Sequence, residues 1–166
     1  MKVEQWEISE SINLEGQTLQ LIGAGVRSVL FMKPYVLAFY ATESYQDYPD
    51  VIASEKPKSM QLIINSDMIN SALIVMGLKE GLGRTTYGQL PELKPKFEHV
   101  FGLLEQLKIK KGDKIDLFAN EQNEIVVYLN GEEQIKEADT KVIKAIFGIW
   151  FSKEFDKKLR NSLLGK

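Results

Sequence analysis

The spacing of apolar residues changes period twice along this chain, and this switch constrains the fold more than any other feature. Apolar and β-branched residues between positions 3 and 41, and again from 60 to 64, are arranged as in strands. Between 67 and 107 the apolar residues recur with the helical period of about 3.6. Residues 114–129 return to strands, and two further helices follow. This order predicts an α+β fold, an open-faced sandwich in which helices cover one face of an antiparallel sheet.

Helix-starting and turn-forming residues give the expected element boundaries. We expect a first helix from about Asp67, a second opened by Pro91 and a last one capped by Ser152. The pair Asn130-Gly131 predicts a tight turn between two strands. These signals agree with the periodicity and complete the α+β assignment.

The strand region before residue 41 has two features that affect any site built there. The glycines at positions 23 and 25 interrupt the pattern and predict a bulge or a close backbone approach. The apolar run that follows has no glycine at Val29-Leu30-Phe31-Met32, so no tight turn is expected in it. On a straight strand, the eight residues from Arg27 to Tyr35 span about 26 Å. The two side chains then lie too far apart to share one ligand group, and they converge only if the chain reverses between them.

Composition and charge exclude several classes of function. A chain of 166 residues fits a single domain, 1–166, and the 44 % of hydrophobic residues suffices for one core. A net charge of −2 argues against a nucleic-acid partner. The chain has no cysteine and one histidine, His99, so no metal site is expected. No complete dinucleotide motif occurs, and no cofactor is expected.

The sequence says little about where the protein resides. No apolar run reaches the roughly 18 residues of a membrane span, and the segment Met1–Glu4 lacks the apolar core of a signal peptide. If a signal peptide has been removed, the protein is periplasmic or secreted, and otherwise it is cytoplasmic. The oligomeric state is equally open.

Four sequence blocks occur in a fixed order over most of the chain. The first joins Gly23-Ala24-Gly25-Val26-Arg27 to the strand Lys33–Tyr40, and the others lie at 79–82, 111–131 and 145–165. Together they resemble the chalcone isomerase-like family, in its bacterial branch. The resemblance implies that family's α+β fold and places the family's arginine at Arg27.

The resemblance also implies a role for Arg27 if the protein is an enzyme. In plant chalcone isomerases this arginine stabilises a phenolate, and polar partners activate water and the ketone. A charged planar guanidinium suits such an anion. The partner positions fall here on Tyr35, near Ser66 and Leu73, and near Lys144, which are not the family's catalytic residue types. No catalytic residue other than Arg27 is therefore expected.

A second branch of the family binds fatty acids, and it implies a different site. There an arginine and a tyrosine hold the carboxylate, which corresponds to Arg27 and Tyr35 here. The apolar face of the first expected helix, with Ile69, Leu73 and Met76, is then expected to line the tail. The expected partner is thus a small apolar or amphipathic anion, held between the sheet and the helices.

Three interpretations remain open at this point. The first is a non-catalytic protein that binds such an anion. The second is an isomerase or lyase acting on another anionic substrate, with Arg27 supplying electrostatic stabilisation. The third is a structural or partner-binding domain without a pocket, in which Arg27 pairs with an acid and Tyr35 is an ordinary core residue. His99 lies off the apolar stripe of its helix and is expected at the surface.

Overall fold

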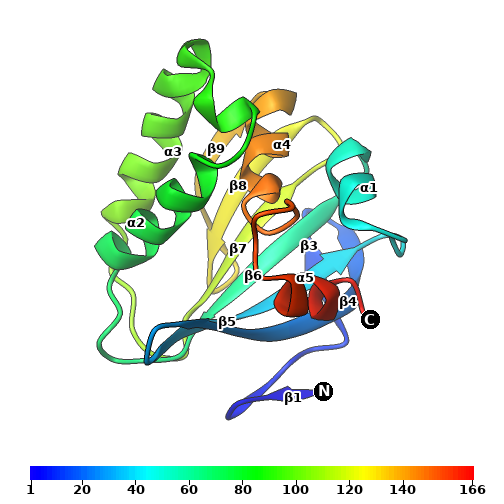
Figure 1. The fold of residues 1–166 in the computed structure, drawn as a ribbon, viewed down its shortest axis with the longest axis vertical. Coiled ribbons are helices and arrows are strands. Elements are labelled where there is room, and N and C mark those ends of the chain that lie inside the picture. Colours follow the sequence, from blue (N-terminus) through cyan, green and yellow to red (C-terminus); the bar gives the residue numbers. More distant parts are fainter.

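A seven-stranded antiparallel sheet, in the strand order β3-β4-β5-β6-β7-β8-β9, organises the computed structural model, which describes residues 1–166 (Figure 1). The strands are β3 (Ser11–Leu14), β4 (Gln17–Val29), β5 (Met32–Ala41), β6 (Lys58–Ile64), β7 (Lys114–Ala119), β8 (Glu124–Leu129) and β9 (Glu132–Ala138). Two short strands, β1 (Lys2–Val3) and β2 (Trp6–Glu7), pair separately near the N-terminus. The α+β fold with helices beside an antiparallel sheet is as predicted.

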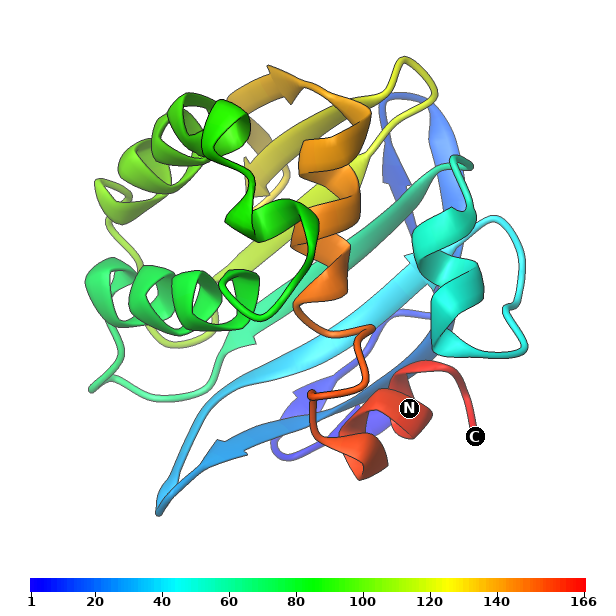
Figure 2. The ribbon, with the colours of Figure 1, turned by 45° about the horizontal axis from the view of Figure 1, so that its top comes forward.

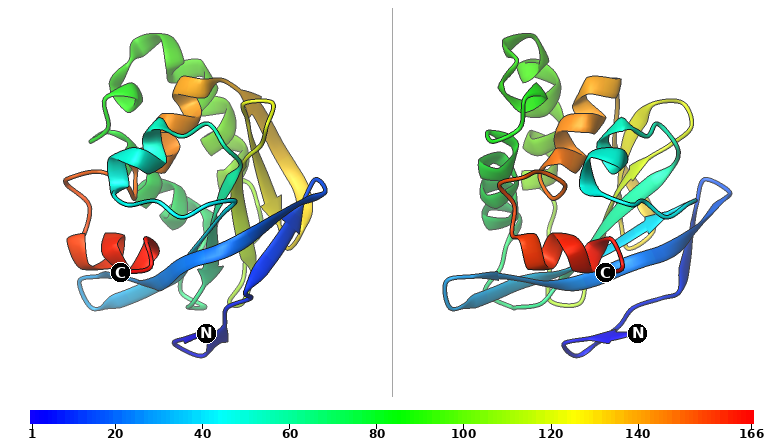
Figure 3. Two further views of the ribbon diagram at one scale, coloured as in Figure 1. Left: turned by 90° about the vertical axis from the view of Figure 1, so that its right-hand side faces the viewer. Right: turned by 45° about the vertical axis from the view of Figure 1, so that its right-hand side comes forward.

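Helices α2, α3 and α4 lie on one face of the sheet (Figures 2 and 3). The α-helices are α1 (Tyr48–Ala53), α2 (Ser71–Leu82), α3 (Lys94–Glu105), α4 (Thr140–Gly148) and α5 (Lys157–Leu163), with short 3-10 turns at Tyr87–Gln89 and Pro91–Leu93. A core of 37 buried residues lies between these helices and the sheet. A smaller core of 10 residues covers part of the other face, around Leu19, Tyr40 and Phe118. The central strands are therefore buried on both faces, which explains their uninterrupted apolar sequence.

The apolar run after Gly25 is two strands rather than one. β4 and β5 pair antiparallel, with Val29 opposite Met32 and a two-residue turn at Leu30-Phe31. Leu30 has a φ of +56°, a conformation in which glycine or asparagine is usual. The turn was not predicted because no residue of the turn-forming types occurs there. Its presence brings the two halves of the run side by side.

Both features expected at the two glycines of β4 are present. The ladder between β4 and β5 has an irregularity between Leu21 and Gly23. Helix α5 also packs directly on this strand, so that a Cβ at Gly23 would lie 2.0 Å from the Ser162 carbonyl oxygen and one at Gly25 would lie 2.6 Å from Leu159. The glycines do not end the strand. They admit the helix that covers it (Figure 3).

Three helix starts differ from the expected ones. Helix α2 begins at Ser71, because the Asn70 side chain accepts a hydrogen bond from the Leu73 amide and caps it. Pro91 opens a 3-10 turn, and α3 follows only from Lys94. The last helix is capped by Asp156 rather than by Ser152.

Candidate ligand-binding site

A cavity of about 310 Å³ lies between the β4–β5 hairpin, helix α2 and the segment that follows α4. Eleven of its 16 lining residues are hydrophobic, so the cavity suits a mainly apolar ligand. Its size is at the lower end of the range of about 300–1,000 Å³ for small-molecule pockets. All five residues predicted for a ligand site line this cavity: Arg27, Tyr35, Ile69, Leu73 and Met76.

Arg27 and Tyr35 lie directly opposite each other on neighbouring strands, with Arg27 on β4 and Tyr35 on β5. The separation of about 26 Å, which holds only for a straight strand, does not apply, because the chain reverses at Leu30-Phe31. Opposite residues in an antiparallel pair have Cβ atoms about 4.5–5.5 Å apart. The structure thus brings together the two side chains that the straight-strand estimate had separated.

The bulge in β4 decides which way Arg27 faces. Before it, Leu19 and Leu21 belong to the smaller core on the far side of the sheet, and after it Ala24 and Val26 do. A regular strand would keep all odd-numbered residues on that far side. The extra residue at the bulge reverses this alternation, so that Gly23, Gly25 and Arg27 face the helices. A one-residue irregularity therefore turns Arg27 into the cavity.

The Arg27 guanidinium has no acidic partner. No aspartate or glutamate forms an ion pair with it, although nine other ion pairs occur in the structure. It is partly buried and stacks on Phe155, with its guanidinium carbon 4.9 Å from the ring centroid. Arg27 is thus a permanent positive charge at an apolar cavity, held in place by an aromatic ring.

The Tyr35 hydroxyl is a second polar group at the same place. The side chain is 8 % exposed, and burial raises the pKa of its phenol above the ordinary value of 10.0, against the lowering effect of the Arg27 charge. Tyr35 is therefore protonated around neutral pH. A protonated phenol can donate a hydrogen bond to an anion that Arg27 attracts.

Trp150 provides a third donor, which was not anticipated from the sequence. Its side chain is fully buried and lines the cavity, where the indole N–H approaches the Tyr35 hydroxyl without forming a well-directed hydrogen bond to it or to any other group. Most buried polar groups are hydrogen-bonded, so an unpaired indole N–H at a cavity wall needs an explanation. The sequence does show a tryptophan in the block Phe147-Gly148-Ile149-Trp150-Phe151. A tryptophan among apolar residues is usually a core residue, so the sequence alone did not indicate a role at the cavity.

The remaining predicted residues form an apolar wall on helix α2. Ile69, just before the helix, is buried, whereas Leu73 and Met76 are 43 % and 64 % exposed. The opposite side of α2 packs into the core through Ile74, Val75 and Leu78, of which Ile74 also lines the cavity. The exposed leucine and methionine therefore lie where the cavity opens to solvent.

Two charged residues of α2 and the following loop, Glu80 and Arg84, also line the cavity and were not predicted. Both are exposed. Glu80 is the only carboxylate in the lining.

The positions that correspond to the plant enzyme's polar partners do not form a catalytic group around Arg27. Leu73 is part of the apolar wall on α2. The Lys144 ammonium donates a hydrogen bond to the Ile52 carbonyl, away from this cavity.

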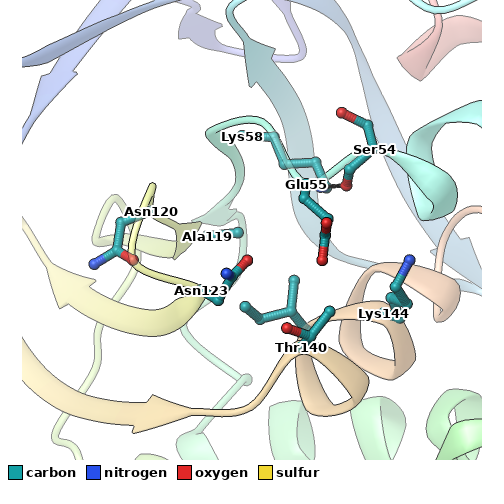
Figure 4. A pocket seen from close by; sticks show the side chains of 9 residues that line it. Ser54, Glu55, Lys58, Ala119, Asn120, Asn123, Thr140 and Lys144 are labelled. Carbon is teal, nitrogen blue, oxygen red and sulfur yellow. Dashed lines mark hydrogen bonds between the residues drawn. The ribbon is translucent and has the colours of Figure 1, made fainter.

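Lys144 belongs to a second, much smaller cavity of about 10 Å³ near α1 and α4 (Figure 4). Its ammonium donates to the Ile52 carbonyl at 3.1 Å, and the Lys58 ammonium donates to the Ser54 carbonyl at 2.6 Å. Burial and the neighbouring Lys144 lower the pKa of Lys58 to about 8. The two lysines thus satisfy carbonyls at the C-terminal end of α1, and the space between them has room for about one water molecule.

Other residues singled out in the sequence lie away from the cavity. His99 is exposed on α3, where its Nδ1 lies 2.9 Å from Glu137. No group of three or more histidine, cysteine, aspartate or glutamate side chains is arranged to hold a metal ion. None of the helices is both long enough and apolar enough to cross a membrane.

Comparison with known proteins agrees with this architecture. The family model described as chalcone isomerase-like matches residues 1–165. A crystal structure of a fatty-acid-binding protein from Arabidopsis thaliana superposes with a TM-score of 0.66, at 14 % sequence identity, over 93 % of this chain and 96 % of that one. No curated protein matches the sequence significantly. The chain therefore belongs to the chalcone isomerase-like family.

Proposed function

We propose that this protein binds a small amphipathic anion, such as a fatty acid, in the cavity between the β4–β5 hairpin and helix α2. One observation carries the proposal. A guanidinium without an acidic partner, a protonated phenol and an indole N–H that makes no well-directed hydrogen bond lie at one apolar cavity. These groups have in common that each can donate to an anionic headgroup, while the rest of the lining accepts an apolar tail.

The division of the cavity supports an amphipathic ligand rather than a uniformly polar one. Arg27, Tyr35 and Trp150 come from three different elements and meet at one region of the lining. Ile69, Leu73 and Met76 form the wall on α2. Methionine suits such a wall because its flexible side chain adapts to tails of different shape. The similarity in fold to a plant fatty-acid-binding protein is consistent with this assignment.

The other two interpretations receive less support from the site. A cavity lies at Arg27, whereas a domain without a pocket requires packed side chains there. An isomerase or lyase of this type needs a group that moves a proton, and the one carboxylate in the lining, Glu80, is exposed on the surface. The binding assignment uses the groups that are present and requires no others.

Native mass spectrometry of protein purified from cells, followed by solvent extraction, tests the proposal. We expect an adduct whose extracted mass is that of a carboxylic or similar acidic lipid. The adduct should be lost in Arg27→Ala and retained in Lys33→Ala, which removes the other cation of the same hairpin. Absence of any acidic lipid in the parent protein, or an unchanged adduct in Arg27→Ala, would contradict the assignment.

A further inference from the structure

Exposed apolar side chains gather on one side of the molecule, at the mouth of the cavity. Nine large hydrophobic side chains are exposed in the whole chain, and seven of them lie on the β4–β5 turn and on or beside helix α2. These seven are Val29, Leu30, Phe31, Met32, Met68, Leu73 and Met76. We call the first four the hairpin tip. Five of the seven also line the cavity, so this surface and the cavity are continuous.

The hairpin tip projects from the body of the protein, as Figure 2 shows. Leu30 is 93 % exposed and Phe31 is fully exposed at 105 %. A two-residue turn needs none of this apolar surface, since asparagine, aspartate or glycine forms such turns better. Leu30 even has a positive φ, which leucine disfavours. Neither packing nor turn formation explains a leucine and a phenylalanine here, so the tip has the character of an interaction surface.

We propose that the hairpin tip inserts into the interfacial region of a lipid bilayer and so places the mouth of the cavity at the membrane. Because Val29, Leu30 and Met32 belong to both the tip and the cavity lining, a tip in the bilayer connects the cavity directly with lipid. A ligand could then pass between the bilayer and the cavity, and its identity as an amphipathic anion rests on the proposed function. The docking itself depends only on the tip.

The area of the tip fits a membrane better than a second protein. An aromatic side chain offers about 150–250 Å², and Val29 and Met32 are more than half covered. The tip therefore exposes on the order of 500 Å², below the roughly 800 Å² per partner of a standard protein interface. A projecting tip would also need a matching pocket in a protein partner, whereas a bilayer surrounds apolar side chains on all sides.

The charges of the hairpin agree with an anionic lipid surface. Arg27 and Lys33 are the only charged residues between positions 16 and 42, although the chain as a whole carries a net charge of −2. Lys33 lies 3.0 Å from Glu4 in an exposed ion pair, which is a weak interaction that lipid headgroups can replace. The hairpin therefore carries no acidic side chain that would repel an anionic headgroup, and Lys33 is its cation outside the cavity.

Flotation with vesicles of phosphatidylcholine and phosphatidylglycerol tests the docking. The test variant is Leu30→Asn/Phe31→Ser, in which asparagine tolerates the positive φ and keeps the turn intact. We expect the parent to float with the vesicles. The variant should partition roughly 100-fold more weakly, because burying a leucine or phenylalanine side chain accounts for more than a tenfold factor each. Leu103→Ser, which removes an exposed leucine on α3, should float like the parent.

Further variants separate this inference from the proposed function. Arg27→Ala should still float, because it changes the cavity and leaves the tip apolar. A parent that floats but carries no acidic lipid would support docking and contradict the proposed ligand. A parent that does not float, or a tip variant that floats equally well, would overturn docking whatever the cavity binds.

Phe31→Trp gives an independent readout that does not depend on loss of binding. We expect its fluorescence emission to shift to shorter wavelength on addition of vesicles and to be quenched by brominated lipids, relative to the parent with its own Trp6 and Trp150. Absence of both changes would overturn docking. Sedimentation without lipid tests the competing occupant, because a parent dimer that becomes a monomer in the tip variant, without vesicle binding, would assign the tip to a second copy of the chain.

Discussion

Arg27 and Tyr35 face each other across the β4–β5 ladder, although eight positions separate them in the sequence. This pairing depends on two local irregularities. The turn at Leu30-Phe31 reverses the chain, and the bulge between Leu21 and Gly23 turns Arg27 towards the helices. The meeting of the Arg27 and Tyr35 side chains at the cavity therefore depends on backbone geometry as much as on residue type.

The unpaired indole of Trp150 leads to the first prediction. Trp150→Phe removes the N–H group and retains an aromatic side chain, so it should weaken binding of an acidic lipid roughly 10–100-fold, the value of one hydrogen bond to a charged group. The free energy of unfolding without ligand should change by less, because the indole N–H forms no well-directed hydrogen bond in that state. Titration calorimetry and chemical denaturation check the two parts. A variant that unfolds much more easily but binds equally well would assign Trp150 a purely structural role.

The turn residue Leu30 leads to a second prediction. Leu30→Asn should raise the free energy of unfolding by up to about 1 kcal/mol, since asparagine tolerates the positive φ that leucine disfavours. Urea denaturation measures the difference. The matched control is Leu103→Asn, which changes another exposed leucine, in helix α3, and should be slightly destabilising because asparagine is a poorer helix former. A clear loss of stability in Leu30→Asn would mean that the leucine side chain packs in the turn.

The packing of α5 against β4 leads to a third prediction. In Gly23→Ala the new methyl group would lie 2.0 Å from the Ser162 carbonyl oxygen. Because backbone cannot yield as a flexible side chain does, we expect a loss of about 3 kcal/mol or more of unfolding free energy. Gly102→Ala in α3 meets nothing within 4 Å and should gain about 0.5–1 kcal/mol from helix propensity. Equal stability of the two variants would contradict this account of the strand.

The buried carboxyl of Asp116 on β7 gives a prediction about pH. Burial raises its pKa from 3.8 to about 6, despite hydrogen bonds from Gln61 and Ser59. A carboxyl whose pKa is higher in the folded chain binds its proton more tightly there, so its contribution to stability is full below about pH 4 and is lost as the pH rises to about 6. The expected loss is on the order of 3 kcal/mol.

Asp116→Asn removes this charge and tests the pH dependence directly. We expect the variant to be more stable than the parent at pH 7 and equal to it at pH 4. Asp67→Asn, at an exposed position, should match the parent at both. Thermal or urea denaturation at the two pH values makes the comparison. A parent and Asp116→Asn with the same difference in stability at both pH values would show that the carboxyl does not titrate between them.

Much of the fold could be predicted because long segments follow one period. The helical period between residues 67 and 107 and the Asn130-Gly131 turn are ordinary local signals, and they correspond to helices α2 and α3 and to the β8–β9 turn. Helix α2 starts later than Asp67 because Asn70 caps it, and Asn65, which precedes Asp67, does not. Asn65 instead accepts a hydrogen bond from the Trp6 indole and donates one to the Lys33 carbonyl, so it holds the N-terminal segment to the hairpin.

Five residues that line the cavity could be predicted from the sequence, whereas their geometry could not. Family resemblance supplied Arg27 and Tyr35, and helical periodicity supplied the wall at Leu73 and Met76. The turn at Leu30 was missed because leucine at a positive φ contradicts turn statistics. Trp150 was missed because only the folded structure shows that its N–H has no partner. Strained or unsatisfied groups of this kind oppose local preferences, and a sequence pattern therefore cannot reveal them.

An anion site at Arg27 is tested by calorimetric titration of delipidated protein with a long-chain fatty acid and with the uncharged alcohol of equal chain length. We predict that the parent binds one equivalent of the acid, and that both Arg27→Ala and replacement of the acid by the alcohol weaken binding roughly 10–100-fold, since each removes the charge-assisted contact. Equal affinity of parent and Arg27→Ala for the acid, or equal affinity of the parent for acid and alcohol, would contradict an anion site at Arg27.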